Sequence, residues 1–184
     1  MIATYVLLCL TVVATLTDVS RQKIYNWTTY SGIAVALLLS GLQTLLSSGL
    51  FSEIGLAESL VGFVSCGGIM LICFLLFQIG GGDVKLLAMM GAFLGLESGI
   101  ETLLWTFVIG GAMALVILIW KMGLIKLFKR VLHQLMCRLG VGVWDELSPD
   151  EKEQLKLPLY LAPAAFLALL IVKFKAVELV SQAI

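Results

Sequence analysis

The sequence predicts an all-α fold: a polytopic membrane protein with six transmembrane helices and an added cytoplasmic amphipathic helix. Of its 184 residues, 60% are hydrophobic and 13% are charged, whereas about 25% of the residues of a soluble domain are charged. At about 20 apolar residues per spanning helix, this composition suffices for about five or six spans and leaves little for a soluble part. We therefore expect one membrane-embedded domain over residues 1–184.

Apolar runs mark the individual spans. Five of them contain no charged residue and are read as spanning helices: 1–17, 27–46, 59–79, 102–120 and 157–172. A sixth run, 84–96, is shorter. Its 13 residues would make a helix of about 20 Å, less than the ~30 Å hydrocarbon core of a bilayer.

The distribution of basic residues favours six spans. If 84–96 crosses the membrane, ten of the twelve Lys and Arg residues share one side, and only Lys173 and Lys175 lie on the other. If it does not cross, the division becomes five against seven. Because basic residues concentrate in cytoplasmic loops, we expect six spans, both termini outside and the loop 121–156 in the cytoplasm.

Residues 121–140 combine apolar residues at helical spacing with several basic residues. This pattern is typical of an amphipathic helix that lies on the anionic cytoplasmic leaflet, so membrane lipid is an expected partner. The formal net charge of the chain is zero. Nucleic-acid binding is therefore not expected, since it requires a basic surface.

Two of the four aspartates, Asp18 and Asp83, occur where a predicted span meets a cytoplasmic loop. The six-span topology places both on the same membrane face. A carboxylate close to hydrocarbon is costly and is a functional candidate by default. Each acid alone is equally well explained as a helix-end residue in water, and Asp83 also as a helix N-cap. Asp145 and Asp150 lie in the polar loop and suggest no special role.

The glycines before Asp83 favour a functional interpretation. Gly80, Gly81 and Gly82 interrupt the helices and, having no Cβ, allow another backbone to approach closely. An extended peptide would fit there. Two facing carboxylates can share one proton, so that one activates water as a general base while the other is a general acid. This is the requirement for aspartic peptide hydrolysis, and it needs no metal or cofactor.

Three segments carry a family resemblance. Residues 80–85, GGGDVK, resemble the GxGD motif of the type IV prepilin peptidase family of membrane aspartyl proteases. Residues 18–27, DVSRQKIYNW, are similar to its other motif, with Tyr25 where proline is usual. Residues 157–163, LPLYLAP, are similar to the proline-containing start of its last helix. The chain lacks the CxxC-bearing segment of larger members and resembles the small form associated with Flp-type, tight-adherence pili.

The resemblance implies an aspartyl endopeptidase with Asp18 and Asp83 as the catalytic pair and Gly80, Gly81 and Gly82 as substrate-binding support. It implies cleavage of the short leader of prepilin or pilin-like proteins at the cytoplasmic face of the bacterial inner membrane. Two alternatives stay open. A small transporter or channel could use the same acids as an ion or proton relay, and a related protease could act on another substrate, such as archaeal preflagellin.

Overall fold

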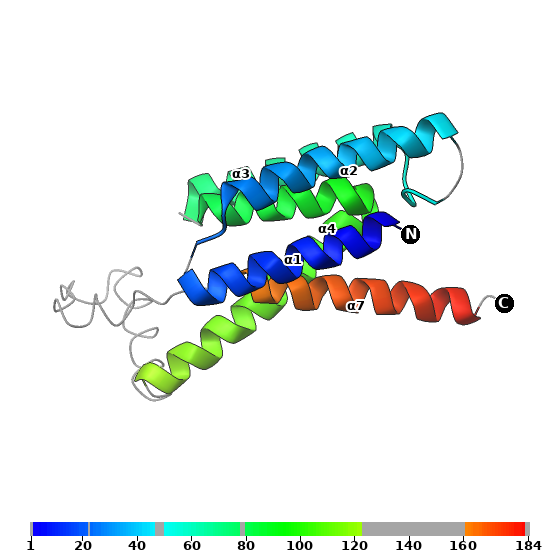
Figure 1. Cartoon of the computed structure of the whole chain (residues 1–184). Coiled ribbons are helices and arrows are strands. Elements are labelled where there is room, and N and C mark those ends of the chain that lie inside the picture. Colours follow the sequence, from blue (N-terminus) through cyan, green and yellow to red (C-terminus); the bar gives the residue numbers. More distant parts are fainter. Residues whose placement is uncertain (1, 22, 47–49, 78–79, 123–160, 183–184) are drawn as a thin grey trace. The chain divides into compact units, whose positions relative to one another are not determined.

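A computed structural model of the chain describes residues 2–21, 23–46, 50–77, 80–122 and 161–182. These residues form helices and no strand, which confirms the predicted all-α class for the described part of the chain. The helices are α1 (Ile2–Arg21), α2 (Asn26–Leu46), α3 (Leu56–Phe77), α4 (Gly81–Met122) and α7 (Leu161–Gln182) (Figure 1). Within the described residues, α1 to α4 are long and apolar enough to cross a membrane, whereas α7 has a shorter apolar stretch, Leu161–Lys173.

The predicted spans 84–96 and 102–120 both fall within α4. The sequence predicts a loop between them, but the structure instead interrupts the helix at a single residue, Gly95, with φ 79° and ψ −171°. Glycine adopts a positive φ at little cost. The number of membrane crossings stays a prediction.

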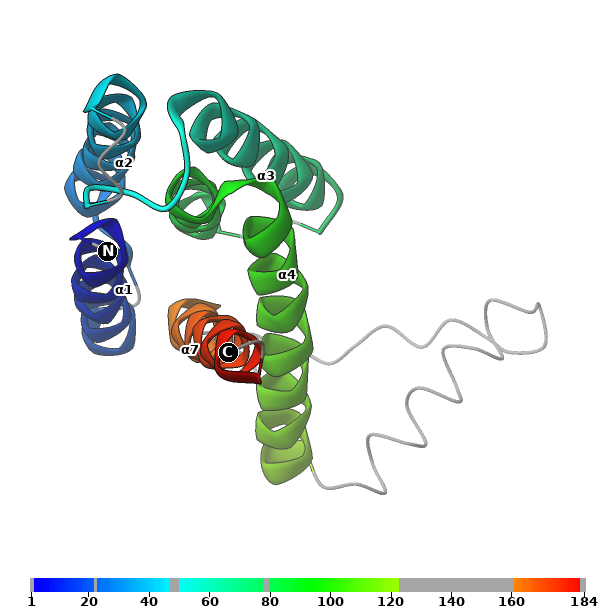
Figure 2. The ribbon, with the colours of Figure 1, turned by 90° about the vertical axis from the view of Figure 1, so that its right-hand side faces the viewer.

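The interruption at Gly95 turns the chain back on itself. A Cβ added to Gly99 would lie 3.2 Å from the Cα of Gly91, although residues eight apart in an unbroken helix are separated by about 12 Å. Figure 2 shows the same change of direction in α4. We call residues 81–94 the first arm of α4; it corresponds to the short run identified in the sequence.

The chain divides into two compact units, one formed by Met1–Ile109 with Tyr160–Ile184 and the other by Gly110–Leu159. In the second unit the structure describes residues 110–122, which are helical. The predicted amphipathic helix at 121–140 and the predicted loop 121–156 lie almost entirely outside the described residues. The single domain over 1–184 remains a prediction, and the following paragraphs concern the first unit.

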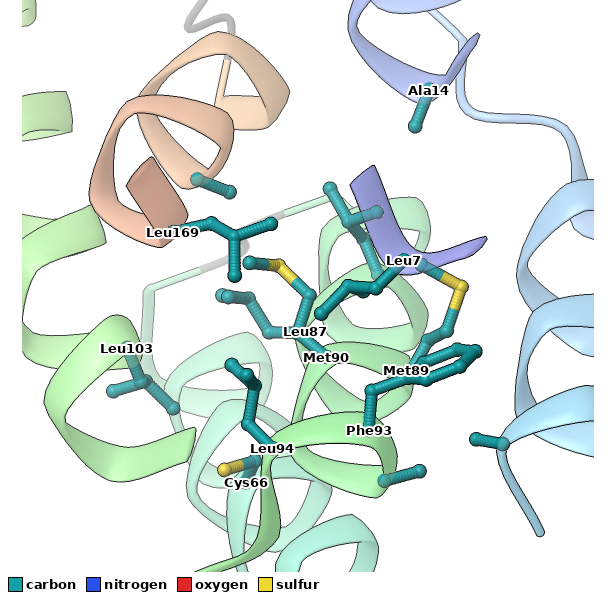
Figure 3. Packing of buried hydrophobic residues seen from close by; sticks show 14 of the residues in the cluster. Leu7, Ala14, Cys66, Leu87, Met89, Met90, Phe93, Leu94, Leu103 and Leu169 are labelled. Carbon is teal, nitrogen blue, oxygen red and sulfur yellow. The ribbon is translucent and has the colours of Figure 1, made fainter. Parts of the chain in front are cut away.

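The first arm of α4 is the centre of the first unit. Its residues from Leu86 to Leu94 are all buried, and a helix that is apolar on every side belongs in an interior. Figure 3 shows side chains of this arm packed among Leu7 of α1, Cys66 of α3 and Leu169 of α7. The helix that begins next to Asp83 is therefore enclosed by other helices.

Helices α3 and α4 approach closely where both have small residues. A Cβ added to Gly91 would lie 2.7 Å from Cβ and 2.9 Å from Sγ of Cys66, and it would also meet the carbonyl oxygen of Gly62. Nearby, the Ser59 hydroxyl donates a 2.6 Å hydrogen bond to the carbonyl oxygen of Ala92. Small residues let helix backbones pack at this range inside a membrane protein.

We expect Gly91→Ala to destabilise the fold, because the added methyl group has no room beside Cys66. Overpacking of this kind costs about 1–3 kcal/mol, so the unfolding temperature of the purified protein in detergent should fall. Gly68→Ala is the matched control, since a Cβ on Gly68 meets nothing within 4 Å. Equal unfolding temperatures for the two variants would contradict this account of the packing.

Residues between α2 and α3 bind the first residues of α1 and Lys173 in α7. The first amides of a helix have no partner inside it; here the N–H groups of Ile2 and Ala3 donate to the carbonyl oxygens of Leu50 and Phe51 at 3.2 and 3.0 Å. Glu53 accepts a 2.7 Å hydrogen bond from Lys173 of α7. Lys173, one of the two exceptions in the charge distribution, is thus an ion-pair partner.

We expect this ion pair to make stability depend on pH. The hydrogen bond from Lys173 lowers the pKa of Glu53 below its ordinary value of 4.5, against a smaller opposing effect of burial. A lowered pKa in the folded state stabilises the fold above pH 4.5, and this contribution is lost as the pH falls through the lowered pKa. Because Glu53 is exposed, the pair contributes at most about 1 kcal/mol.

Lys173→Met should therefore lower the unfolding temperature slightly at neutral pH, and the difference from wild type should vanish in acid. Lys23→Met, which alters an exposed lysine in the turn after α1, is the control. A difference between Lys173→Met and wild type that is unchanged at acid pH would show that the ion pair does not cause it.

Candidate active site

Asp18 lies in the last turn of α1 and is buried. Its Oδ2 accepts a hydrogen bond of 3.3 Å from the backbone N–H of Ala162, the second residue of α7. That amide is one of the first-turn donors with no partner inside their own helix, and the N-terminal end of a helix dipole attracts a negative charge. The carboxylate of Asp18 thus ties the end of α1 to the start of α7.

Asp83 lies in the first turn of α4. Its backbone N–H donates a 3.1 Å hydrogen bond to the carbonyl oxygen of Gly80, so that the chain turns tightly into the helix. The carboxylate folds back over the same glycine, because a Cβ on Gly80 would lie 3.0 Å from Oδ2 of Asp83. An acidic residue in this turn also interacts favourably with the helix dipole.

The two acids lie within reach of each other's charge. Asp18 comes from the end of one helix and Asp83 from the start of another, 65 positions later in the chain, and they are close enough for the charge of Asp18 to act on Asp83. The helix-end explanation of each acid taken singly does not require this proximity. Two acids facing one another can hold one proton between them, as general acid–base chemistry at a peptide bond requires.

The three glycines have different surroundings. Gly80 lies under the carboxylate of Asp83, and a Cβ on Gly82 would lie 3.1 Å from Cβ of Ile24, in the turn between α1 and α2. A Cβ on Gly81 would meet nothing within 4 Å. A side chain at Gly80 or Gly82 would therefore displace Asp83 or Ile24 by a few tenths of an ångström, while the space above Gly81 is open.

Lys85 joins α4 to α2. Its Nζ donates a 2.9 Å hydrogen bond to Oδ1 of Asn26 and lies 4.9 Å from the centre of the Tyr30 ring, a distance typical of a cation–π contact. From the sequence, a lysine that sets topology is a better interpretation of Lys85 than one that steadies a charge near Asp83, because two positions along a helix place it on a different side from Asp83. That different side is the one that faces α2.

Tyr25 shapes the turn between α1 and α2. Its carbonyl oxygen accepts hydrogen bonds from the N–H groups of Thr28 and Thr29 at 3.1 and 3.4 Å. Its hydroxyl accepts a 2.6 Å hydrogen bond from Nη1 of Arg21, whose guanidinium also lies 6.0 Å from the centre of the ring. These bonds define the turn that holds Ile24 against Gly82, although Tyr25 stands where the resemblance leads one to expect proline.

No group of three or more His, Cys, Asp or Glu side chains that could hold a metal ion occurs in the described residues. The titratable groups brought together at this site are the two aspartates. That the protein needs no metal or cofactor stays a prediction.

The fold and the site define a class: a multi-pass helical membrane protein with one carboxylate at the end of α1 and another at a glycine-rich helix start, within reach of each other's charge. Comparison with protein families gives a match to the type IV leader peptidase family over residues 5–115. Because this match covers more than half of the chain, the protein belongs to that family. Neither the curated proteins nor the solved structures contain a match.

Family membership makes the protein a peptidase and confirms the resemblance drawn from the sequence motifs. The matched residues include both aspartates and the three glycines but end before α7. The contact between Ala162 and Asp18 therefore joins the matched region to a helix outside it.

Proposed function

We propose that the protein is an aspartyl endopeptidase that removes the short leader of type IV, Flp-type prepilin-like proteins. The observation that carries this proposal is that Asp18 and Asp83 lie within reach of each other's charge, next to Gly80, Gly81 and Gly82, in a member of the type IV leader peptidase family. A transporter that relays ions through the same acids would not cleave a peptide. The family match favours the peptidase.

In the proposed reaction, the two aspartates share one proton and hold a water molecule between them. The ionised carboxylate takes a proton from the water as its oxygen attacks the scissile carbonyl carbon, while the protonated carboxyl group gives its proton to the carbonyl oxygen. The tetrahedral intermediate then collapses: one of its hydroxyl groups returns a proton to the aspartate that gave one, the C–N bond breaks, and the leaving amine receives a proton from the aspartate that gained one. No covalent bond to the enzyme forms.

The three glycines would form the surface over which the substrate backbone lies. An extended peptide needs room for its own backbone, and open space is available above Gly81. Glycine allows close backbone approach because it has no Cβ. The scissile bond would then lie next to Asp83, which follows directly in the chain.

The proposal includes a topology: six spans within one domain of the bacterial inner membrane, with Asp18, Asp83 and the loop 121–156 on the cytoplasmic side. We expect Ser20→Cys and Ser148→Cys to react with an impermeant thiol reagent from the cytoplasmic side. Ser48→Cys and Ser98→Cys should react from the outside, all in a variant whose four native cysteines have been replaced. Labelling of Ser148→Cys from outside would overturn the topology.

The function is tested by co-expressing the chain with candidate Flp-type prepilins and reading the new N-terminus by mass spectrometry. The expected product lacks the basic leader and is absent when Asp18→Asn replaces the wild type. Intact precursor in the presence of well-inserted wild-type protein would contradict the proposal for the prepilins tested. Intact precursor combined with proton or cation flux through reconstituted vesicles would favour the relay.

A further inference from the structure

The backbone of Ala162 contacts two side chains of α1. Its N–H donates to Oδ2 of Asp18 at 3.3 Å, and its carbonyl oxygen accepts a hydrogen bond of 3.3 Å from Oγ1 of Thr15. Thr15 and Asp18 are three positions apart, so they lie on the same face of α1. Together the two side chains bind the N–H and the carbonyl oxygen of Ala162, on either side of its Cα, at the start of α7.

The packing of α1 against α7 permits this contact. Ala14 of α1 and Ala162, Ala165 and Ala168 of α7 are almost completely buried, and small side chains let two helix backbones come close. Figure 1 shows α1 and α7 lying side by side. A backbone group of one helix is therefore within reach of side chains on the other.

The hydroxyl of Thr15 does not need Ala162 in order to be satisfied. It also lies 2.8 Å from the carbonyl oxygen of Thr11, the usual partner for a threonine in a membrane helix. Thr17 bonds in this way to Ala14 at 2.9 Å, as does Thr11 to Leu7 at 2.9 Å. Thr15 differs from these two in having a described bond to another helix.

We propose that Thr15 is a positioning residue for Asp18. By holding the carbonyl oxygen of Ala162, Thr15 keeps the N–H of the same residue on Oδ2 of Asp18 and fixes the orientation of the carboxylate. The other oxygen of Asp18 is then left for proton transfer. This inference rests on the proposed function, in which Asp18 is catalytic.

The test measures kcat and KM for cleavage of a purified Flp-type prepilin precursor by the full chain in detergent. Thr15→Val keeps the shape of the side chain and removes the hydroxyl. We expect kcat to fall about tenfold with KM within about twofold of wild type, because a misplaced catalytic group affects the chemical step. Thr15→Ser should restore kcat, since serine supplies the same donor.

Thr17→Val is the matched control, because it removes a hydroxyl bonded within α1. Its kcat should equal that of wild type. A purely structural role for Thr15 would lower the unfolding temperature and the yield but leave kcat per folded molecule unchanged. If Thr15→Val does not fold, Thr15→Ala compared with Thr17→Ala decides the question by the same measurement.

The outcomes separate this inference from the proposed function. Wild-type protein that leaves the precursor intact, or Asp18→Asn that still cleaves it, overturns the proposed function and the inference with it. Wild-type cleavage that Asp18→Asn abolishes, together with equal kcat for Thr15→Val and Thr17→Val, overturns the inference alone. A loss in Thr15→Val that Thr15→Ser does not restore also overturns it.

Discussion

Asp18→Asn and Asp83→Asn are each expected to abolish leader cleavage, because an amide can neither accept the proton of water nor return one to the leaving amine. The double variant should be hardly worse than either single variant, since residues that act as one catalytic unit give strongly non-additive losses. The measurement is the rate of product formation by purified protein at matched concentrations. Wild-type protein should give a bell-shaped dependence on pH, with two apparent pKa values that belong to the pair.

Asp145→Asn and Asp150→Asn are the controls for this prediction. Both change an aspartate to asparagine in the polar segment 141–156, far in sequence from either member of the pair, and both should keep wild-type activity. All variants must be present in the membrane at wild-type levels. If either Asp18→Asn or Asp83→Asn cleaves at close to the wild-type rate, the two-aspartate mechanism is wrong and the ion relay becomes the better explanation.

The proximity of Asp18 and Asp83 could be foreseen from the sequence because it follows from the number and direction of the helices that precede Asp83. Apolar runs define where helices lie, and alternating passes bring the end of the first and the start of the fourth to one side. The structure puts the two acids within reach of each other's charge. Their catalytic role is a separate matter, which the assay above decides.

Contacts that depend on three-dimensional packing could not be foreseen. The donor to Asp18 is a backbone N–H at Ala162, 144 positions away, and every residue except proline has such a group. Only the packing of α7 on α1 selects this one. The bond between Lys85 and Asn26 is hidden for the same reason, because lysine at a helix end is common whether or not it has a partner.

The interruption of α4 at Gly95 could be predicted only in part from the sequence. Gly91 and Gly95 have the GxxxG spacing that predicts close helix packing, and Gly91 does pack against α3. Gly95 also has a positive φ, and sequence spacing carries no information on backbone dihedral angles. In the sequence, the change of direction is indicated by the polar residues Glu97 and Ser98, which follow Gly95.

Gly80→Ala is expected to lower kcat for leader cleavage by about tenfold or more, since small displacements of a catalytic group are costly. The added Cβ would lie 3.0 Å from Oδ2 of Asp83, and the backbone of Gly80 does not have the positive φ that would itself exclude alanine. The carboxylate therefore has to move by a few tenths of an ångström while the fold is kept. The measurement is kcat and KM of the purified variant, with its unfolding temperature recorded in parallel.

Gly81→Ala separates displacement of the acid from obstruction of the substrate. Its Cβ would meet no protein atom within 4 Å, so Asp83 stays in place and kcat should be retained. If the leader peptide lies over Gly81, the new methyl group occupies the space of the substrate and KM should rise. Gly41→Ala, also with nothing within 4 Å of its Cβ but located in α2, should change neither constant. The assignment of Gly80 as support for Asp83 fails if Gly80→Ala has the kcat of Gly41→Ala, because the displaced carboxylate would then have no effect on the reaction.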